Sequence, residues 1–383
     1  MRNYWEIFIV SLKLGLTSFG GPTAHLAYFQ KEYVDHRQWL NHKEYAELVV
    51  LSQFLPGPAS SQVGMGIGFI RGGWFGSFCS FLGFTFPSVF LLMLFATILQ
   101  NTALAMDWLD GLKLVAVAIV AHAIVDMAKK ILVTKRHWGI AIGSLAILLL
   151  WTGILSQVIV LAVAILCGLF FLKPGQFEQS KERALPSLKT GLLLLFAFFV
   201  GLIGLPALLG IFPNDWLQMV SSLYVSGSLV FGGGHVVLPL LETQFVQAGI
   251  ISADEFLAGY GFTQAVPGPL FTFASYLGTT LFGFFGGLVA TIAIFLPAFL
   301  ILFGVWPIWY KLKGNSTVRK GMAGLNAAVV GILAAAWVNP IVTTSIHNGM
   351  DIIVAIIFYA LLAKAKLQPL WIVGLGVIVG ILL

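Results

Sequence analysis

The tripeptide Pro-Gly-Pro occurs twice in this chain, each time inside an apolar stretch long enough to cross a membrane. Because proline lacks a backbone N–H and glycine adds backbone freedom, each copy should unwind a helix for several residues. The half-helix after the break then offers free N–H groups and a positive dipole end, which can bind an anion. A kink that only shapes packing is the alternative; two copies in matching positions favour the anion site. The expected site residues are Gln53, Pro56, Gly57, Pro58 and Ser60 in the first copy, and Gln264, Pro267, Gly268 and Pro269 in the second.

A run of glycines precedes each Pro-Gly-Pro copy and offers a second possible anion contact. Consecutive glycines allow a tight turn, and successive N–H groups in such a turn can form an anion-binding concavity. A helix end packed closely against a neighbour explains the same glycines equally well. A histidine lies beside each turn, as a ligand or as an ordinary loop residue. The candidates are Gly20, Gly21, Pro22 and His25 in the first half, and Gly232, Gly233, Gly234 and His235 in the second.

Ionisable residues inside apolar spans are costly and therefore suggest function. Lys13 either balances a bound anion or extends to a loop carbonyl. His122 and Asp126 lie one helical turn apart and are candidates for a proton relay, although Asp126 could instead lie at the membrane surface beside two lysines. Arg71, at the end of the first Pro-Gly-Pro span, is either a forked oxyanion ligand or an anchor for topology.

Composition indicates a membrane protein, and the sequence contains no recognisable catalytic motif. Apolar residues make up 59% of the chain and charged residues 9%, whereas soluble domains hold about 25% charged residues. The net charge of +6 comes from Lys and Arg in short loops between spans, so we expect no nucleic-acid partner. The two cysteines lack metal-ligand spacing, and no nucleophile motif, carboxylate pair or nucleotide-binding loop occurs. We therefore expect no metal, no cofactor and no enzyme.

The apolar runs predict an all-α polytopic membrane protein with about 13 transmembrane helices. The motifs recur at a nearly constant offset, which divides the chain into a first repeat at 1–173, a loop with a linker helix at 174–212, and a second repeat at 213–383. About six spans per repeat plus the linker helix would insert the second repeat upside down. Alternatively, the Pro-Gly-Pro segments are re-entrant hairpins, and the two repeats are parallel.

Basic residues predict the orientation of the chain. If the N-terminus is cytoplasmic, most Lys and Arg residues fall in cytoplasmic loops, including the clusters at 129–136 and 311–320. The loop at 234–254 does not fit this rule, because it would be cytoplasmic and yet holds no Lys or Arg.

Four stretches in combination resemble the chromate ion transporter (CHR) family: Phe19–His25, Gln53–Pro58, Phe231–His235 and Gln264–Pro269. The resemblance covers essentially the whole chain, in the long, two-domain form of the family. It implies export of chromate across the bacterial cytoplasmic (inner) membrane, driven by the proton motive force and competed by sulfate. It also implies two homologous halves of opposite topology, and chromate-like or sulfate-like oxyanions, protons and the lipid bilayer as partners.

Two alternatives stay open at this point. A passive anion channel could use the same helix ends as a carrier, and steep pH dependence with saturable flux would distinguish the carrier. Glycines spaced four apart, such as Gly64 and Gly68, permit close helix packing within one chain or between the two copies of a homodimer.

Overall fold

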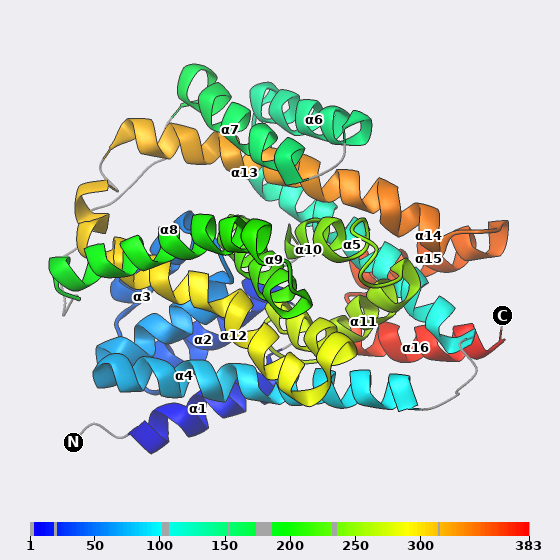
Figure 1. The fold of residues 1–383 in the computed structure, drawn as a ribbon, viewed down its shortest axis with the longest axis horizontal. Helices are drawn as coiled ribbons and strands as arrows, with labels where there is room; N and C mark the ends of the chain where they lie inside the picture. Colours follow the sequence, from blue (N-terminus) through cyan, green and yellow to red (C-terminus); the bar gives the residue numbers. More distant parts are fainter. Residues whose placement is uncertain are drawn as a thin grey trace. The chain divides into compact units, whose positions relative to one another are not determined.

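The computed structural model describes residues 4–18, 21–101, 107–151, 154–173, 186–231, 236–312 and 315–382, and in these ranges it is helical without strands (Figure 1). The helices up to the linker are α1 Tyr4–Thr17, α2 Gly21–Phe29, the π-helix η1 Gln30–His36, α3 His42–Phe54, α4 Ala59–Asn101, α5 Asp107–Ile131, α6 Lys135–Leu150, α7 Ile154–Phe171 and α8 Leu188–Ile211. The later helices are α9 Asp215–Leu229, α10 Val237–Phe245, α11 Ala253–Ala265, the 3-10 helix η3 Leu270–Thr272, α12 Phe273–Leu312, α13 Ser316–Ala336, the π-helix η4 Trp337–Val342, α14 Thr343–Ser345, α15 Gly349–Ala363 and α16 Pro369–Leu382.

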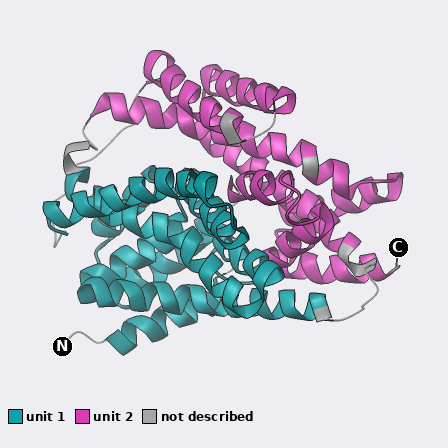
Figure 2. Ribbon diagram, viewed as in Figure 1, with its two compact units in different colours: residues 1–103, 178–234, 266–310 teal, residues 104–177, 235–265, 311–383 magenta. Residues whose placement is uncertain are grey.

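The chain forms two compact units, and each unit draws on both ends of the sequence (Figure 2). Unit 1 holds residues 1–103, 178–234 and 266–310, and unit 2 holds residues 104–177, 235–265 and 311–383. Both Pro-Gly-Pro turns therefore belong to unit 1, although they are far apart in the sequence.

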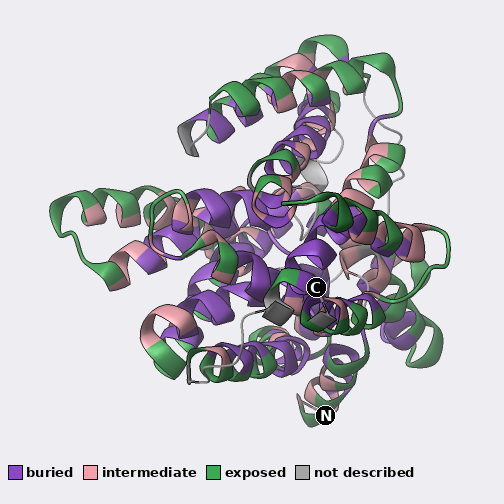
Figure 3. Cartoon of the chain, turned by 90° about the vertical axis from the view of Figure 1, so that its right-hand side faces the viewer, coloured by how far each residue is buried: buried purple, intermediate pink, exposed green. Residues whose placement is uncertain are grey.

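Helix length and surface composition identify a membrane protein. Five helices are long and apolar enough to cross a bilayer, and shorter apolar helices lie among the remaining described residues. Exposed residues are widespread on the helices (Figure 3). They include many large apolar residues, and in α8 only 6% of the most apolar stretch is buried. Since water would disfavour so much exposed apolar surface, these faces are suited to lipid. The count of 13 spans stays a prediction.

Helix α1 forms an antiparallel hairpin with the continuous segment made of α2 and η1 (residues 21–36), and we call this pair hairpin A. Ser11 Oγ lies 3.0 Å from Tyr33 Oη, and Arg37 Nη1 lies 2.9 Å from Glu6 Oε1. The partner in η1 moves later in the sequence as the partner in α1 moves earlier, so η1 runs back along α1 in the opposite direction. The chain therefore returns to the side on which α1 begins.

A second hairpin, hairpin B, consists of α3 and the first part of α4 (residues 59–72), with the first Pro-Gly-Pro at its tip. Its first arm, α3, begins with a capping box in which Asn41 and Glu44 satisfy each other's backbone N–H groups. The side chain of Leu48 lies so close to Gly66 that a Cβ there would come within 2.6 Å of Leu48 Cδ1. In a straight helix these residues would be about 25 Å apart. The structure thus favours the re-entrant arrangement over a broken span that continues across the membrane.

Both long helices fold back on themselves at a glycine. In α4, Gly73 has φ +65°, and Ser80 Oγ donates to Gly64 O at 2.8 Å across the fold. In α12, Gly283 has the same φ, and Gly278 lies against Gly286. Each of these helices is therefore a pair of antiparallel arms, which we call the short arm (59–72 in α4, 273–281 in α12) and the long arm (74–101 and 284–312).

Unit 2 is packed through small residues. Gly324 of α13 lies against Ala164 and Gly168 of α7, and Gly111 of α5 lies against Gly376 of α16. At these positions any Cβ would meet backbone atoms of the neighbouring helix, as in membrane bundles whose helices approach through small residues. Lys113 joins α5 to α11 by an ion pair with Asp254 at 2.7 Å.

Candidate oxyanion site

The first Pro-Gly-Pro turn is held by residues of the second half of the chain. Gly57 N donates to the carbonyl of Val230, at the end of α9, over 2.7 Å. Gly57 has φ +113°, and a Cβ there would come within 2.8 Å of Ala298 Cβ in the long arm of α12. Glycine is required at this position for its backbone conformation and also for this close approach.

The second Pro-Gly-Pro turn makes the same contacts with the first half. Gly268 N donates to Ser18 O, just beyond the end of α1, over 3.0 Å. Gly268 has φ +108°, and a Cβ there would come within 2.8 Å of Ser88 Oγ in the long arm of α4. Each turn thus binds the first helix and the long arm of the opposite repeat, a reciprocal exchange that indicates a local two-fold relation between the segments.

The two turns lie at the middle of the long arms. Ser88 is near the midpoint of 74–101, and Ala298 is at the midpoint of 284–312. Each long arm measures about 40 Å at 1.5 Å per residue, so it can cross a bilayer completely. Both turns therefore lie about halfway along helical arms that are long enough to cross a bilayer.

Several hydrogen-bond donors without a partner occur at the start of α4 and on serine side chains of unit 1. Gln62 is the first residue of α4 whose N–H bonds within the helix, to Pro58 O at 3.0 Å, so the N–H groups of 59–61 have no partner inside the helix. The hydroxyls of Ser18, Ser52 and Ser61 are buried and have no hydrogen-bond partner among the described residues. Buried polar groups without partners are uncommon, and Ser61 lies in the first turn of α4. Backbone N–H groups and hydroxyls of this kind are suitable ligands for a tetrahedral oxyanion.

His25 connects hairpin A to the same region. Its Nδ1 lies 3.3 Å from Ser60 Oγ, and its ring packs edge-on against Phe84 of the long arm. Gln62 Nε2 donates to Pro56 O at 2.9 Å and fixes the shape of the first turn. The structure therefore brings His25 to Ser60, which follows the first Pro-Gly-Pro by two positions.

A sequence model of chromate transporters matches two sections of the chain, residues 5–169 and 217–381. The chain belongs to the chromate transporter family. Curated relatives that align over nearly its whole length include an uncharacterised transporter of Methanocaldococcus jannaschii, which is 29% identical over 99% of this chain and 94% of its own. The chromate transport protein of Pseudomonas aeruginosa is 26% identical over 96% of this chain and 89% of its own. A probable chromate transport protein of Synechococcus elongatus is 26% identical over 97% and 93%.

No solved structure matches the chain. The family and its named members are transporters and not enzymes, as the sequence predicted. The family match also repeats along the chain, in agreement with the duplication of the motifs.

Other site residues predicted for this member of the family lie in varied surroundings. Gln53 is exposed, whereas its counterpart Gln264 is buried and bonds to Tyr260. Gly21, with φ +76°, and Pro22 open α2, beside the tip of hairpin A. Pro267 and Pro269 flank Gly268 in the second turn. Gly20, Gly232, Gly233, Gly234 and His235 lie outside the described residues.

The ionisable candidates differ in their surroundings. Lys13 Nζ is 3.5 Å from Glu32 Oε2, and Asp126 Oδ2 is 2.7 Å from Lys130 Nζ on an exposed surface. Asp126 thus lies beside a lysine, the alternative that the sequence had offered. His122 has a buried Nδ1 without a partner and packs on Tyr359. Arg71 is exposed and its guanidinium lies 5.0 Å from the centre of the Trp39 ring, which is an arrangement suited to an anchor.

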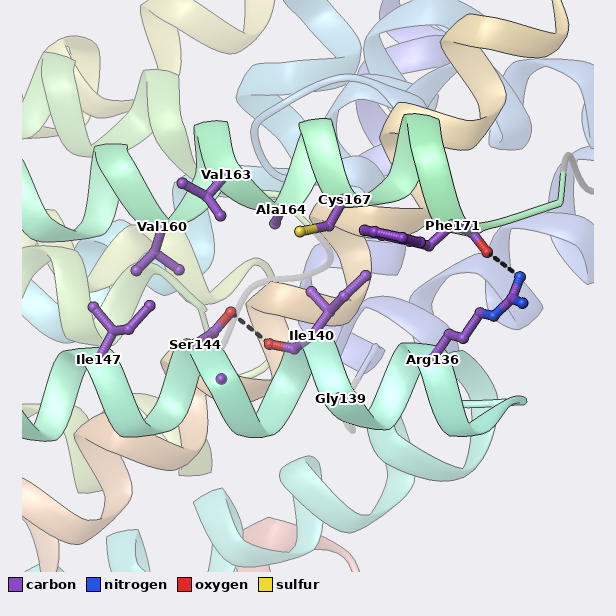
Figure 4. A pocket seen from close by; sticks show the side chains of 11 residues that line it. Arg136, Gly139, Ile140, Ser144, Ile147, Val160, Val163, Ala164, Cys167 and Phe171 are labelled. Atoms are coloured by element: carbon purple, nitrogen blue, oxygen red, sulfur yellow. Dashed lines mark hydrogen bonds between the residues drawn. The ribbon is translucent and has the colours of Figure 1, made fainter.

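A separate cavity lies between α6 and α7 (Figure 4). Its volume is about 300 Å³, and mainly apolar side chains such as Ile140, Ile147 and Val163 line it. The guanidinium of Arg136, at one end, donates to Phe171 O at 2.7 Å. An apolar cavity offers a dianion little in exchange for its hydration, so we do not place the substrate here.

Sequence reasoning missed the partners of the two turns. Ser18 and Val230 contribute carbonyls, while Ser88 and Ala298 contribute close contacts. None of these residues has a distinctive type. Only their matching positions relative to the duplicated motifs could have indicated them.

Proposed function

We propose that this protein is a secondary active transporter that exports chromate, or a similar tetrahedral oxyanion such as sulfate, across the cytoplasmic membrane. The observation that carries the proposal is the reciprocal pairing of the two Pro-Gly-Pro turns at the midpoints of the long arms. Membership of the chromate transporter family, whose named members include chromate transport proteins, supports this substrate class.

The substrate would bind between a helix N-terminus and buried hydroxyls. Chromate and sulfate are tetrahedral dianions of similar size. The N–H groups of 59–61 and the hydroxyls of Ser18 and Ser61 would therefore donate hydrogen bonds to either anion. Neutral donors hold a dianion without the strong attraction of a lysine or arginine, which favours release on the other side of the membrane. The two turns are therefore proposed as the alternating-access site, around which the two repeats rock.

The hairpins suggest a topology for the proposed repeats, 1–173 and 213–383. Hairpins A and B both return the chain to the side of the N-terminus, and the long arm of α4, α5, α6 and α7 then cross the membrane. With α8 as a further crossing, the second repeat enters from the opposite side and is inverted. If the N-terminus is cytoplasmic, most Lys and Arg residues are then at the cytoplasmic side, and Lys13, Lys31 and Lys113 are the exceptions.

This topology also accounts for the loop that did not fit the sequence prediction. The segment after α10, which lacks Lys and Arg, would face the outside instead of the cytoplasm. Arg37 and Lys43 would correspondingly move to the cytoplasmic side. Re-entrant hairpins and inverted repeats are therefore compatible in this proposal, provided that the second repeat has two hairpins like hairpins A and B.

Thiol labelling tests the topology. In a background with Cys79→Ser and Cys167→Ser, a cysteine introduced by Gln38→Cys should react only from the cytoplasmic side, because Gln38 is exposed after hairpin A. A cysteine introduced by Ala248→Cys, exposed after α10, should react only from outside with a membrane-impermeant maleimide. Labelling of both positions from one side of intact cells would show that the repeats are not inverted.

Export of a dianion would draw on the proton motive force. An inside-negative potential already favours outward movement of each negative charge by about 2.3 kcal/mol per 100 mV. Exchange for protons would add the pH gradient to this driving force. A carrier of this kind saturates and depends on pH, whereas a passive anion channel does neither.

Uptake of labelled chromate into everted vesicles tests the function. We expect saturable uptake that sulfate inhibits and that an uncoupler lowers by about tenfold, since a pH gradient of about one unit drives tenfold accumulation per coupled proton. Vesicles without the protein are the control. Non-saturable flux that an uncoupler leaves unchanged would indicate a channel, and absence of chromate flux would remove chromate as the substrate.

A further inference from the structure

Two buried glutamates differ in the partner that each one has. Glu32 lies in η1 of the first half and is 8% exposed, and Glu242 lies in α10 of the second half and is 5% exposed. Each carboxylate bonds to the side chain five positions later, Arg37 for Glu32 and Gln247 for Glu242. Glu32 therefore has a cationic partner, and Glu242 has a neutral one.

Glu32 is surrounded by positive charge. Arg37 Nε donates to its Oε1 at 2.8 Å, and Lys13 Nζ lies 3.5 Å from its Oε2. Burial on its own would raise the pKa of Glu32, but the hydrogen bond and charge of Arg37 together with the charge of Lys13 lower this pKa below its usual value. Glu32 is consequently an ionised structural group.

Glu242 has no such neutralisation. Gln247 Nε2 donates to its Oε2 at 2.9 Å, and no Lys, Arg or His in the described ranges lies within ion-pair distance. The carboxyl is beside the end of α6 and the start of α7, outside the candidate spans. Burial raises its pKa to about 7, against a smaller lowering by the Gln247 hydrogen bond. This carboxyl is therefore able to exchange a proton near neutral pH.

A small polar cavity adjoins Glu242. It has a volume of about 30 Å³, which is room for one water molecule, and is lined by Gln157, Thr243 and Asn339 among others. Gln157 is 6% exposed; its Nε2 donates to Thr243 Oγ1 at 3.1 Å, while its buried Oε1 has no partner within the described ranges. This unpartnered acceptor beside the carboxyl suits a water that delivers a proton. From α6, α7, α13 and η4, the cavity lining contributes no other ionisable side chain.

We propose that Glu242 is the proton-binding group that couples proton entry to oxyanion export. The inference rests on the proposed function and adds to it the residue that carries the proton. A water in the cavity breaks one of its O–H bonds as its proton adds to a Glu242 carboxylate oxygen, and it takes up another proton from solvent, so the water is unchanged overall. The Glu242 O–H bond breaks when the proton leaves on the other side, and no electrons are transferred.

The test separates anion exchange from proton coupling in proteoliposomes that contain the whole protein. We expect Glu242→Gln to keep sulfate counterflow at equal pH within about twofold, yet to lose the roughly tenfold accumulation that a pH gradient of about one unit drives per proton. Gln247→Arg should have the same effect, because it supplies Glu242 with the cation that Glu32 has. Asp215→Asn, on the exposed first turn of α9, is the matched control and should behave as the wild type.

Infrared difference spectra give a readout that does not depend on transport. Between about pH 6 and pH 8, purified wild-type protein should lose a protonated carboxyl band that is absent from Glu242→Gln.

Three results would each overturn the assignment. They are retained pH-driven accumulation in Glu242→Gln, loss of counterflow together with accumulation in that variant, and an infrared band that the substitution leaves unchanged. Accumulation driven by a Na⁺ gradient at constant pH, and lost in Glu242→Gln, would also overturn it in favour of a sodium site. If the wild type shows no counterflow of sulfate or chromate, the proposed function fails, while the infrared band still decides the protonation of Glu242.

Discussion

Gly57→Ala is expected to abolish transport and to destabilise the folded protein by roughly 2–5 kcal/mol. The positive φ of Gly57 strains any L-residue, and the added methyl group would come within 2.8 Å of Ala298 Cβ, which cannot rotate away. It would also displace the Gly57 N–H from Val230 O. Since folded proteins are stable by only about 5–15 kcal/mol, a loss of this size is visible in thermal unfolding of the purified protein.

Two matched variants make this prediction specific. Gly268→Ala has the same backbone strain, but it meets the Ser88 hydroxyl, which can change rotamer, so it should destabilise less than Gly57→Ala. Gly143→Ala has nothing within 4 Å of the added methyl and should be silent. In the double variant Gly57→Ala with Ala298→Gly, stability should recover only in part, because the strain in φ persists. Wild-type transport by Gly57→Ala would show that the reciprocal turns are not needed.

Replacement of Ser18 and Ser61 by alanine should have opposite effects on transport and stability. Each buried hydroxyl lacks a hydrogen-bond partner among the residues that the structure describes, so its removal should leave stability unchanged or slightly higher. In the complex each would donate a charge-assisted hydrogen bond of about 1.5–3 kcal/mol, so the pair should lower chromate affinity by at least about 100-fold. Initial uptake rates over a range of chromate concentrations give this affinity. Ser144→Ala is the control, because that hydroxyl bonds within its own helix to Ile140 O.

Features encoded by local sequence were predictable. The Pro-Gly-Pro turns, the capping box at Asn41 and the membrane class follow from residue type and spacing alone. The approach of His25 to Ser60 was also consistent with both being candidates. Local chemistry dictates these features, so distant contacts do not override them.

Features that depend on distant contacts were not predictable. Hydropathy cannot distinguish a span from two arms of a re-entrant hairpin, because both are continuous apolar runs; only contacts such as that of Leu48 with Gly66 separate them. The composition of the two units, each built from both ends of the chain, also leaves no trace in the sequence. Glu242 was overlooked because its burial and its neutral partner Gln247 become visible only in the folded structure.

Equilibrium binding of labelled sulfate and chromate to the purified protein is the most direct test of the central claim, that the paired turns hold the oxyanion. Wild-type protein should bind both anions competitively and with one saturable component, and Ser18→Ala with Ser61→Ala should weaken this binding by at least about 100-fold while Ser144→Ala does not. If the double variant binds sulfate and chromate as tightly as the wild type, the oxyanion site is elsewhere in the molecule.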